Sequence, residues 1–296
     1  MLVQRKNNNI GTKIQPIYAL VKSRAQRGLV FTCTTIIALL LSSNLHPSPL
    51  HVVILPIITM FSTLSIYLMN DLVDIKIDKI NAPNRPLASG AVKKQDALKL
   101  VIGLGIGSVV IASLVSTLTI YLTITYLLIG VLYSIPKISL KDRSFAKTIM
   151  IAIGGLITSL IGSSFSGLFE ERSTIAAVTF MTLIFVTSPI NDLADYSGDK
   201  KYGKRTIPIV IGKKNTVLFA ITIPFAIAIF FWFFYAQLNF GILTPIAITV
   251  LSFFALRVLK SIYNNRDDQK HVRVKHKKLV FLHYGLQIAF LVGMIF

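Results

Sequence analysis

The chain has 296 residues, of which 53% are hydrophobic and 15% charged, with a formal net charge of +19 and a mean hydropathy of +0.68. Because soluble domains carry about 25% charged residues, this composition excludes an ordinary soluble enzyme, a coiled coil and a disordered chain. The single cysteine, Cys33, excludes an internal disulfide framework and a multi-cysteine zinc site.

Nine apolar segments follow one another along the chain. Since a spanning helix needs about 20 apolar residues, they predict an all-α, polytopic membrane bundle of nine transmembrane helices. Residues 1–27 are expected to form a cytosolic basic segment, in which Ile14 to Arg27 is either an interfacial amphipathic helix or a plain basic tail. Residues 28–296 are expected to form one domain. The predicted spans are 28–44, 50–69, 98–115, 119–135, 148–167, 173–191, 215–235, 241–257 and 279–296.

The basic residues are distributed very unevenly between the two ends of these spans. Of the 31 lysine and arginine residues, all except Arg172 lie on one side of the alternation. Cytoplasmic loops of membrane proteins are enriched in Lys and Arg, so we predict a cell-membrane protein with a cytosolic N-terminus, cytosolic large loops and an outer C-terminus. This rule explains the positive charge without a nucleic-acid partner, and none is expected.

Two acidic boxes share the pattern N-D-x-x-D-x-x-x-D. The first runs from Asn70 to Asp78 and the second from Asn191 to Asp199, each at the predicted cytosolic end of an apolar span. Such a match in an acid-poor chain indicates an internal duplication. The predicted halves are about 28–135 and 148–257, and the last helix, 279–296, follows them.

The spacing within each box predicts a shared polar face. Each residue of a helix turns by about 100°, so the asparagine and the three aspartates would occupy one stripe. Three neighbouring carboxylates repel one another and need a positive partner, either Lys and Arg or a metal ion. Oxygen ligands without histidine favour a hard cation, and Mg²⁺ commonly binds one or two carboxylates together with a substrate phosphate. Each box is therefore predicted to hold Mg²⁺ against a diphosphate, with nearby cationic side chains on the phosphate oxygens.

Several stretches resemble motifs of the UbiA superfamily of intramembrane prenyltransferases. The first is Asn70 to Asp78 with Asn84 to Gly90, and the second is Asp195 to Asp199 followed by Lys200, Gly203, Thr206 and Pro208. Tyr133-Ser134 and Leu140-Lys141 are similar to a loop of the same family. The resemblance extends over nearly the whole chain. It implies a UbiA-like fold and an enzyme that transfers a prenyl group from an allylic diphosphate to an acceptor.

The resemblance also implies roles for individual residues. Tyr133 would stabilise an allylic cation through its ring face, although an aromatic residue near a helix end also serves as an interfacial anchor. The implied catalytic residues are Asp74, Asp195, Tyr133 and Lys141; the implied diphosphate ligands are Arg85, Lys141, Lys204 and Arg205; and the implied Mg²⁺ ligands are Asn70, Asp71, Asp74, Asp78, Asp192, Asp195 and Asp199.

The acceptor is the least determined part of this prediction. Pro83 to Pro86 and Gly198 to Pro208 look most like archaeal enzymes that transfer a geranylgeranyl group to the glycerol hydroxyl of geranylgeranylglycerol phosphate. That reaction forms the second ether bond of archaeal membrane lipids. An aromatic acid, a quinone precursor or a tetrapyrrole is an alternative acceptor, and a transporter without chemistry is a further alternative. No chemistry is expected of the histidines, including His271, His276 and His283.

Overall fold

The computed structural model describes residues 10–135, 140 and 144–295. Its regular elements over this part of the chain confirm the predicted all-α class. The helices are α1 (Ile10–Ser42), α2 (Pro49–Val73), α3 (Ile75–Asn81), α4 (Lys94–Ala112), α5 (Thr117–Ser134), α6 (Ser144–Ser163), the 3₁₀ turn η2 (Ser164–Ser166), α7 (Glu171–Ala194), α8 (Tyr196–Lys201), α9 (Ile207–Val210), α10 (Lys213–Phe234), α11 (Leu243–Asn264) and α12 (Gln269–Ile295).

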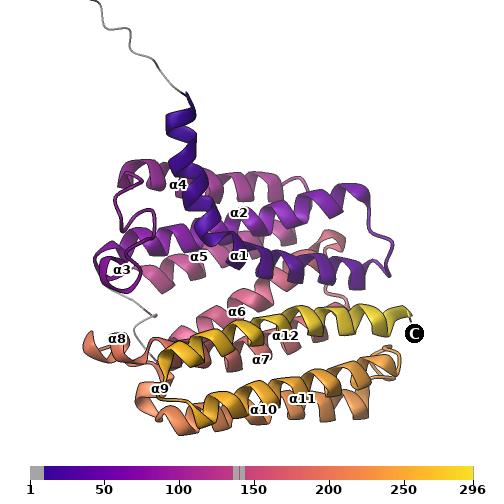
Figure 1. Cartoon of the computed structure of the whole chain (residues 1–296). Helices are drawn as coiled ribbons and strands as arrows, with labels where there is room; N and C mark the ends of the chain where they lie inside the picture. Colours follow the sequence, from indigo (N-terminus) through magenta and orange to yellow (C-terminus); the bar gives the residue numbers. More distant parts are fainter. Residues whose placement is uncertain (1–9, 136–139, 141–143, 296) are drawn as a thin grey trace, which may run out of the picture.

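Nine helices of the described ranges are long and apolar enough to cross a membrane, and each overlaps one predicted span. Two of them begin at least ten residues earlier than predicted. The helix expected at residue 28 begins at Ile10, and the helix expected at residue 279 begins at Gln269. Lysine and arginine end an apolar run but are good helix formers, so hydropathy alone placed both starts too late. The predicted 1–27 segment is therefore continuous with the first span from Ile10 onward, and in Figure 1 its N-terminal part leaves the bundle at a steep angle.

The long helices lie side by side in one bundle (Figure 1). Helices α1, α2, α4 and α5 form one group, α7 and α10 to α12 form the other, and α6 packs between α1 and α7. The contact of α6 with α1 is close because Gly162 faces the Thr35 backbone, where a Cβ atom would collide with the carbonyl oxygen. Small residues permit this approach between membrane helices. The short helices α3, α8 and α9 gather at one end of the bundle (Figure 1).

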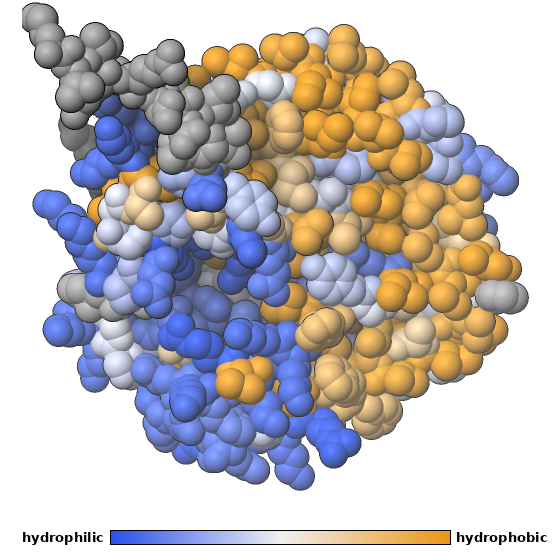
Figure 2. Space-filling view, turned by 45° about the horizontal axis from the view of Figure 1, so that its top comes forward, coloured by the Kyte–Doolittle hydropathy of each residue, from blue (hydrophilic) through white to orange (hydrophobic). Residues whose placement is uncertain are grey.

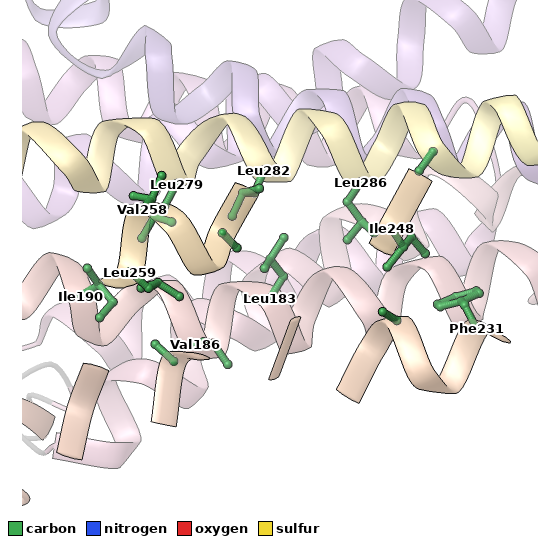
Figure 3. Close-up of a cluster of buried hydrophobic side chains, with 14 of the residues drawn as sticks. Leu183, Val186, Ile190, Phe231, Ile248, Val258, Leu259, Leu279, Leu282 and Leu286 are labelled. Carbon is green, nitrogen blue, oxygen red and sulfur yellow. The ribbon is translucent and has the colours of Figure 1, made fainter. Parts of the chain in front are cut away.

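Apolar residues fill the interior and also cover the outside. A large buried cluster joins α7, α10, α11 and α12 around Leu183, Phe231 and Leu286 (Figure 3). On the outside, Phe233 and Phe281 are 74% and 68% exposed. Figure 2 shows hydrophobic residues over much of one face and hydrophilic residues gathered toward one end. An apolar outer surface of this extent is suited to lipid contact.

Both acidic boxes begin on a long helix and end on a short one. Helix α2 ends at Val73 and α3 begins at Ile75, while α7 ends at Ala194 and α8 begins at Tyr196. Asp74 and Asp195, at the two breaks, have φ/ψ of −90°/8° and −107°/10°. The prediction of one unbroken helical stripe was therefore wrong, since aspartate is a poor interior helix residue and favours helix ends. The matching order of elements supports the duplication, which stays a prediction.

Candidate active site

The two boxes meet at one cavity of about 350 Å³. Helices α1, α2, α5, α6, α7 and α12 all contribute to its wall. Figure 2 shows a hollow among the hydrophilic residues of the molecule. Segments far apart in sequence therefore bring their polar groups to a single cavity. The box residues that line it are Asn70, Asp74, Asp78, Asn191, Asp192, Asp195 and Asp199.

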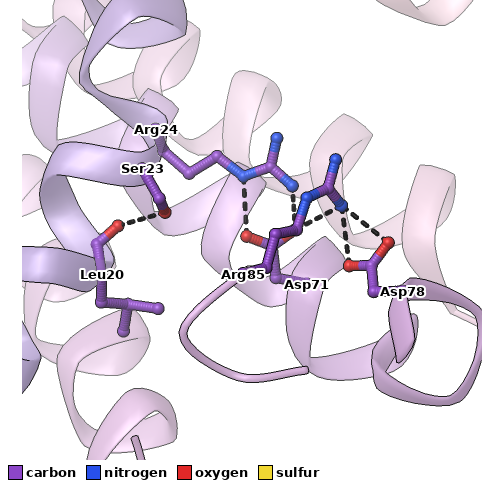
Figure 4. Close-up of polar contacts among 6 residues, drawn as sticks. All are labelled: Leu20, Ser23, Arg24, Asp71, Asp78 and Arg85. Carbon is purple, nitrogen blue, oxygen red and sulfur yellow. Dashed lines mark hydrogen bonds and ion pairs between the residues drawn. The ribbon is translucent and has the colours of Figure 1, made fainter. Parts of the chain in front are cut away.

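In the first box, two arginines hold two of the carboxylates (Figure 4). Arg85 donates from Nη1 to both oxygens of Asp78 at 2.7 Å and lies 3.4 Å from Asp71 Oδ1. Arg24 of α1 donates from Nε to Asp71 Oδ2 at 2.7 Å and from Nη2 to Oδ1. Asp71 is buried and is not among the residues that line the cavity. Its ion pair with Arg24 joins α2 to α1. Burial raises the pKa of Asp78 above the usual aspartate value, and Arg85 opposes this shift.

In the second box, each carboxylate meets a cation from a different element. Asp192 Oδ1 accepts a hydrogen bond from Lys147 Nζ of α6. Asp195 lies 2.7 Å from Arg273 Nη2 of α12, and Asp199 lies 3.3 Å from Lys204 Nζ. Burial raises the pKa of Asp195 above its usual value, while the Arg273 charge lowers it. Asp192 Oδ2 is buried and has no hydrogen-bond partner among the described residues, so it can accept one further ligand.

The remaining predicted site residues divide into three groups. Arg85, Lys204 and Tyr133 line the cavity. Arg205 is exposed and is not among the lining residues, although it follows Lys204 directly. Lys141, predicted both as a catalytic residue and as a diphosphate ligand, lies outside the described residues.

Several residues that line the cavity were not predicted from the sequence. No chemistry was expected of the histidines, yet two of them lie at the site. His276 and His283 are buried and line the cavity. The signal for them was helical spacing on α12, where Arg273, His276, Val280 and His283 recur every three or four residues. The missed residues were Arg24, Arg27, Tyr67, Tyr126, Lys147, Arg273, His276 and His283.

The donors at the mouth of the cavity suit a hard cation. They are carboxylate and amide oxygens, which are the ligands that a hard cation such as Mg²⁺ prefers. Within the described part of the chain, no three His, Cys, Asp or Glu side chains form a ready-made metal cage. Carboxylates divided between two walls fit an ion that takes one or two protein ligands and completes its coordination with substrate oxygens. The orphaned Asp192 Oδ2 fits the same role.

Known proteins resemble the chain in sequence and in fold. The model of the UbiA prenyltransferase family matches residues 30–284. The digeranylgeranylglyceryl phosphate synthase of Methanosphaera stadtmanae is 29% identical over 232 residues, covering 75% of this chain and 79% of the relative. The synthase of the same name from Pyrococcus furiosus is 35% identical over 153 residues, covering 51% and 53%.

Two solved structures show the same fold. One, described as digeranylgeranylglyceryl phosphate synthase in membranes, has a TM-score of 0.73 at 24% identity and covers 96% of this chain and 99% of its own. The other is a UbiA homologue from Archaeoglobus fulgidus bound to GPP and Mg²⁺, with a TM-score of 0.68 at 17% identity. It covers 92% of this chain and 99% of its own. Both likenesses extend over the whole bundle.

Proposed function

Because the chain belongs to the UbiA prenyltransferase family and is a multi-pass intramembrane prenyltransferase, we propose that it acts on geranylgeranyl diphosphate. The acceptor is the glycerol hydroxyl of geranylgeranylglycerol phosphate, and the product is the second ether bond of an archaeal membrane lipid. The observation that carries this proposal is the meeting of two acidic boxes, each with cationic partners, at one cavity in an apolar bundle. The relatives named digeranylgeranylglyceryl phosphate synthase support the choice of acceptor.

The proposed cofactor is Mg²⁺. The residues that would hold it are Asn70, Asp74 and Asp78 on one wall and Asp192, Asp195 and Asp199 on the other. The A. fulgidus homologue bound to GPP and Mg²⁺ supports this choice. When bound, the ion neutralises negative charge that develops on the leaving diphosphate. Asp71 was predicted as a further ligand, but its burial against Arg24 favours a structural role.

The cationic side chains supply the diphosphate site. Arg85, Lys147 and Lys204 each line the cavity and each lie beside a carboxylate of a box. Their donors also match phosphate oxygens, and an arginine fork can bind two of them at once. Because they are fixed in place by the boxes, they stabilise the charge of the departing group more than that of the bound donor.

Below the charged mouth, the wall is aromatic and aliphatic. Phe31 lies with its ring centroid 6.3 Å from Tyr67 and 6.4 Å from Tyr126, and Tyr133 completes this part of the lining. Aromatic ring faces attract positive charge, so these rings stabilise an allylic cation. They also exclude water, which would otherwise capture the cation before the acceptor reacts.

A transfer assay on the purified protein in detergent tests this function. Labelled geranylgeranyl diphosphate is offered with geranylgeranylglycerol phosphate or with 4-hydroxybenzoate, in Mg²⁺ or in EDTA. Label in a diether that appears only with Mg²⁺ is the expected result. Label in the aromatic product alone would overturn the acceptor and retain prenyl transfer, whereas no transfer to either acceptor would overturn the proposal.

We also propose that the cavity mouth and the N-terminus face the cytosol and that the C-terminus lies outside. The support is the Lys and Arg asymmetry together with the short helices α3, α8 and α9, which share the end opposite the C-terminus (Figure 1). Single cysteines in a Cys33→Ser background test it, at the exposed positions Ser89 and Leu168. An impermeant maleimide on intact cells should label Leu168→Cys and spare Ser89→Cys, and the reverse would invert the topology.

A further inference from the structure

Helix α12 contributes two histidines to the cavity, and the proposed function gives neither of them a role. His276 and His283 are only 9% and 5% exposed, and both line the cavity that the acidic boxes share. They lie seven residues apart, which places them on the same face of the helix. Neither residue belongs to a box, so neither is needed to explain how the diphosphate is held.

The hydrogen bonds of Thr187 favour one tautomer of His283. The Thr187 hydroxyl donates to the Leu183 carbonyl oxygen at 3.0 Å, so its own oxygen is free to accept. His283 Nε2 lies 3.1 Å from that oxygen and can donate to it in the tautomer that carries the ring proton on Nε2. A neutral imidazole carries one proton, so Nδ1 is left as a bare acceptor. This Nδ1 is buried and has no hydrogen-bond partner among the described residues.

The position of His283 suits the hydroxyl side of the reaction. Its partner Thr187 precedes Asp192 by five residues on α7, so it lies about 7.5 Å deeper along the helix axis than the carboxylates. In the proposed reaction, the diphosphate would be held by the charged residues, so the allylic carbon would lie on this inner side of them. Phe180 packs edge-on against the His283 ring, with 5.2 Å between the two ring centroids. This contact helps to hold the imidazole ring in place.

We propose that Nδ1 of His283 accepts the proton of the acceptor hydroxyl, and this rests on the proposed function because it requires a hydroxyl acceptor. The hydroxyl oxygen forms its new bond to the allylic carbon with a lone pair. The bond from that carbon to the diphosphate oxygen breaks, and its electron pair leaves with the diphosphate. The hydroxyl proton passes to Nδ1. Thr187 is a positioning residue, since its oxygen keeps the other ring proton on Nε2.

The test compares two acceptors that differ in one atom. One is geranylgeranylglycerol phosphate, and the other carries a thiol in place of the reacting hydroxyl. A thiol ionises far more readily and does not depend on a base. We expect His283→Gln to lower transfer to the hydroxyl by about 100-fold or more, and to the thiol by less than about 10-fold, with unchanged donor affinity.

Variants of the positioning residue and a matched control complete the experiment. Thr187→Val should reduce hydroxyl transfer selectively, and Thr187→Ser should restore it. His271 lies on the same helix and also pairs with a hydroxyl, Ser261 Oγ at 3.0 Å, but is not among the cavity-lining residues. His271→Gln should therefore match the wild type.

Each outcome separates this inference from the proposed function. Equal losses with the hydroxyl and thiol acceptors would assign His283 a packing role and overturn the inference. Wild-type transfer in His283→Gln would overturn it as well, with the proposed function intact. Failure of the wild-type protein to use the hydroxyl acceptor would instead overturn the proposed function. Should His283→Gln not fold, the Thr187 pair of variants decides the question.

Discussion

The ion pair between Arg24 and Asp71 allows a test of whether Asp71 stabilises the bundle or binds the metal ion. It joins α1 to α2, and its side chains are only 12% and 4% exposed. Replacing Arg24 with methionine leaves the Asp71 carboxylate buried, with Arg85 Nη1, at 3.4 Å, as a weaker cationic contact. The variant should therefore lose stability through an uncompensated charge, while every carboxylate that lines the cavity is retained.

The size of the effect follows from the two hydrogen bonds that Arg24 makes. Removing one partner of a buried ion pair costs about 3–5 kcal/mol. Two hydrogen bonds to a charged group, at about 1.5–3 kcal/mol each, give a similar total. Because Arg85 retains part of the interaction, we expect Arg24→Met to lower the free energy of unfolding by about 3 kcal/mol. The double variant Arg24→Met/Asp71→Met removes both charges and should recover most of that loss.

Unfolding by denaturant in detergent micelles, followed by helical circular dichroism, measures this difference. Arg27→Met is the matched control, because Arg27 lies one turn further along α1 and is exposed. It should unfold close to the wild type. The reasoning is refuted if the double variant is no more stable than Arg24→Met. It is equally refuted if Asp71→Asn keeps full stability but loses Mg²⁺-dependent donor binding, since Asp71 would then be a metal ligand.

Three further predictions concern the site and the bundle. Asp74→Ala and Asp195→Ala should each lower prenyl transfer by about 100-fold or more while the protein remains inserted, and wild-type turnover in either would remove that box from the site. EDTA should abolish transfer and added Mg²⁺ should restore it, so that metal-independent turnover would contradict the proposed cofactor. Gly162→Ala should destabilise the bundle by about 1–3 kcal/mol through its clash with Thr35, whereas Gly103→Ala, with open space around its Cβ position, should not, as parallel unfolding curves would show.

The features that could be predicted from the sequence are those that depend on neighbours along the chain. A membrane span must satisfy its backbone hydrogen bonds within one helix, so an apolar run of sufficient length predicts its own structure. The nine spans followed from this rule. The spacing of Asn70 to Asp78 and of Asn191 to Asp199 likewise predicted two equivalent acidic sites before any contact was known. Helix starts were less predictable, because the basic residues at the beginning of α1 and α12 fit a helix but not a hydropathy window.

The tertiary structure decided which side chains meet. Asp71 and Asp74 stand in the same box, yet one is held by Arg24 of α1 and the other lines the cavity. His283 reads as one more residue of an apolar run, and only the packing of α12 against α7 brings its Nε2 to Thr187 and its ring to the cavity. These contacts join residues from 47 to 96 positions apart. Local spacing carries no information about such pairs, because they depend on which helices pack together and on how each is rotated about its axis.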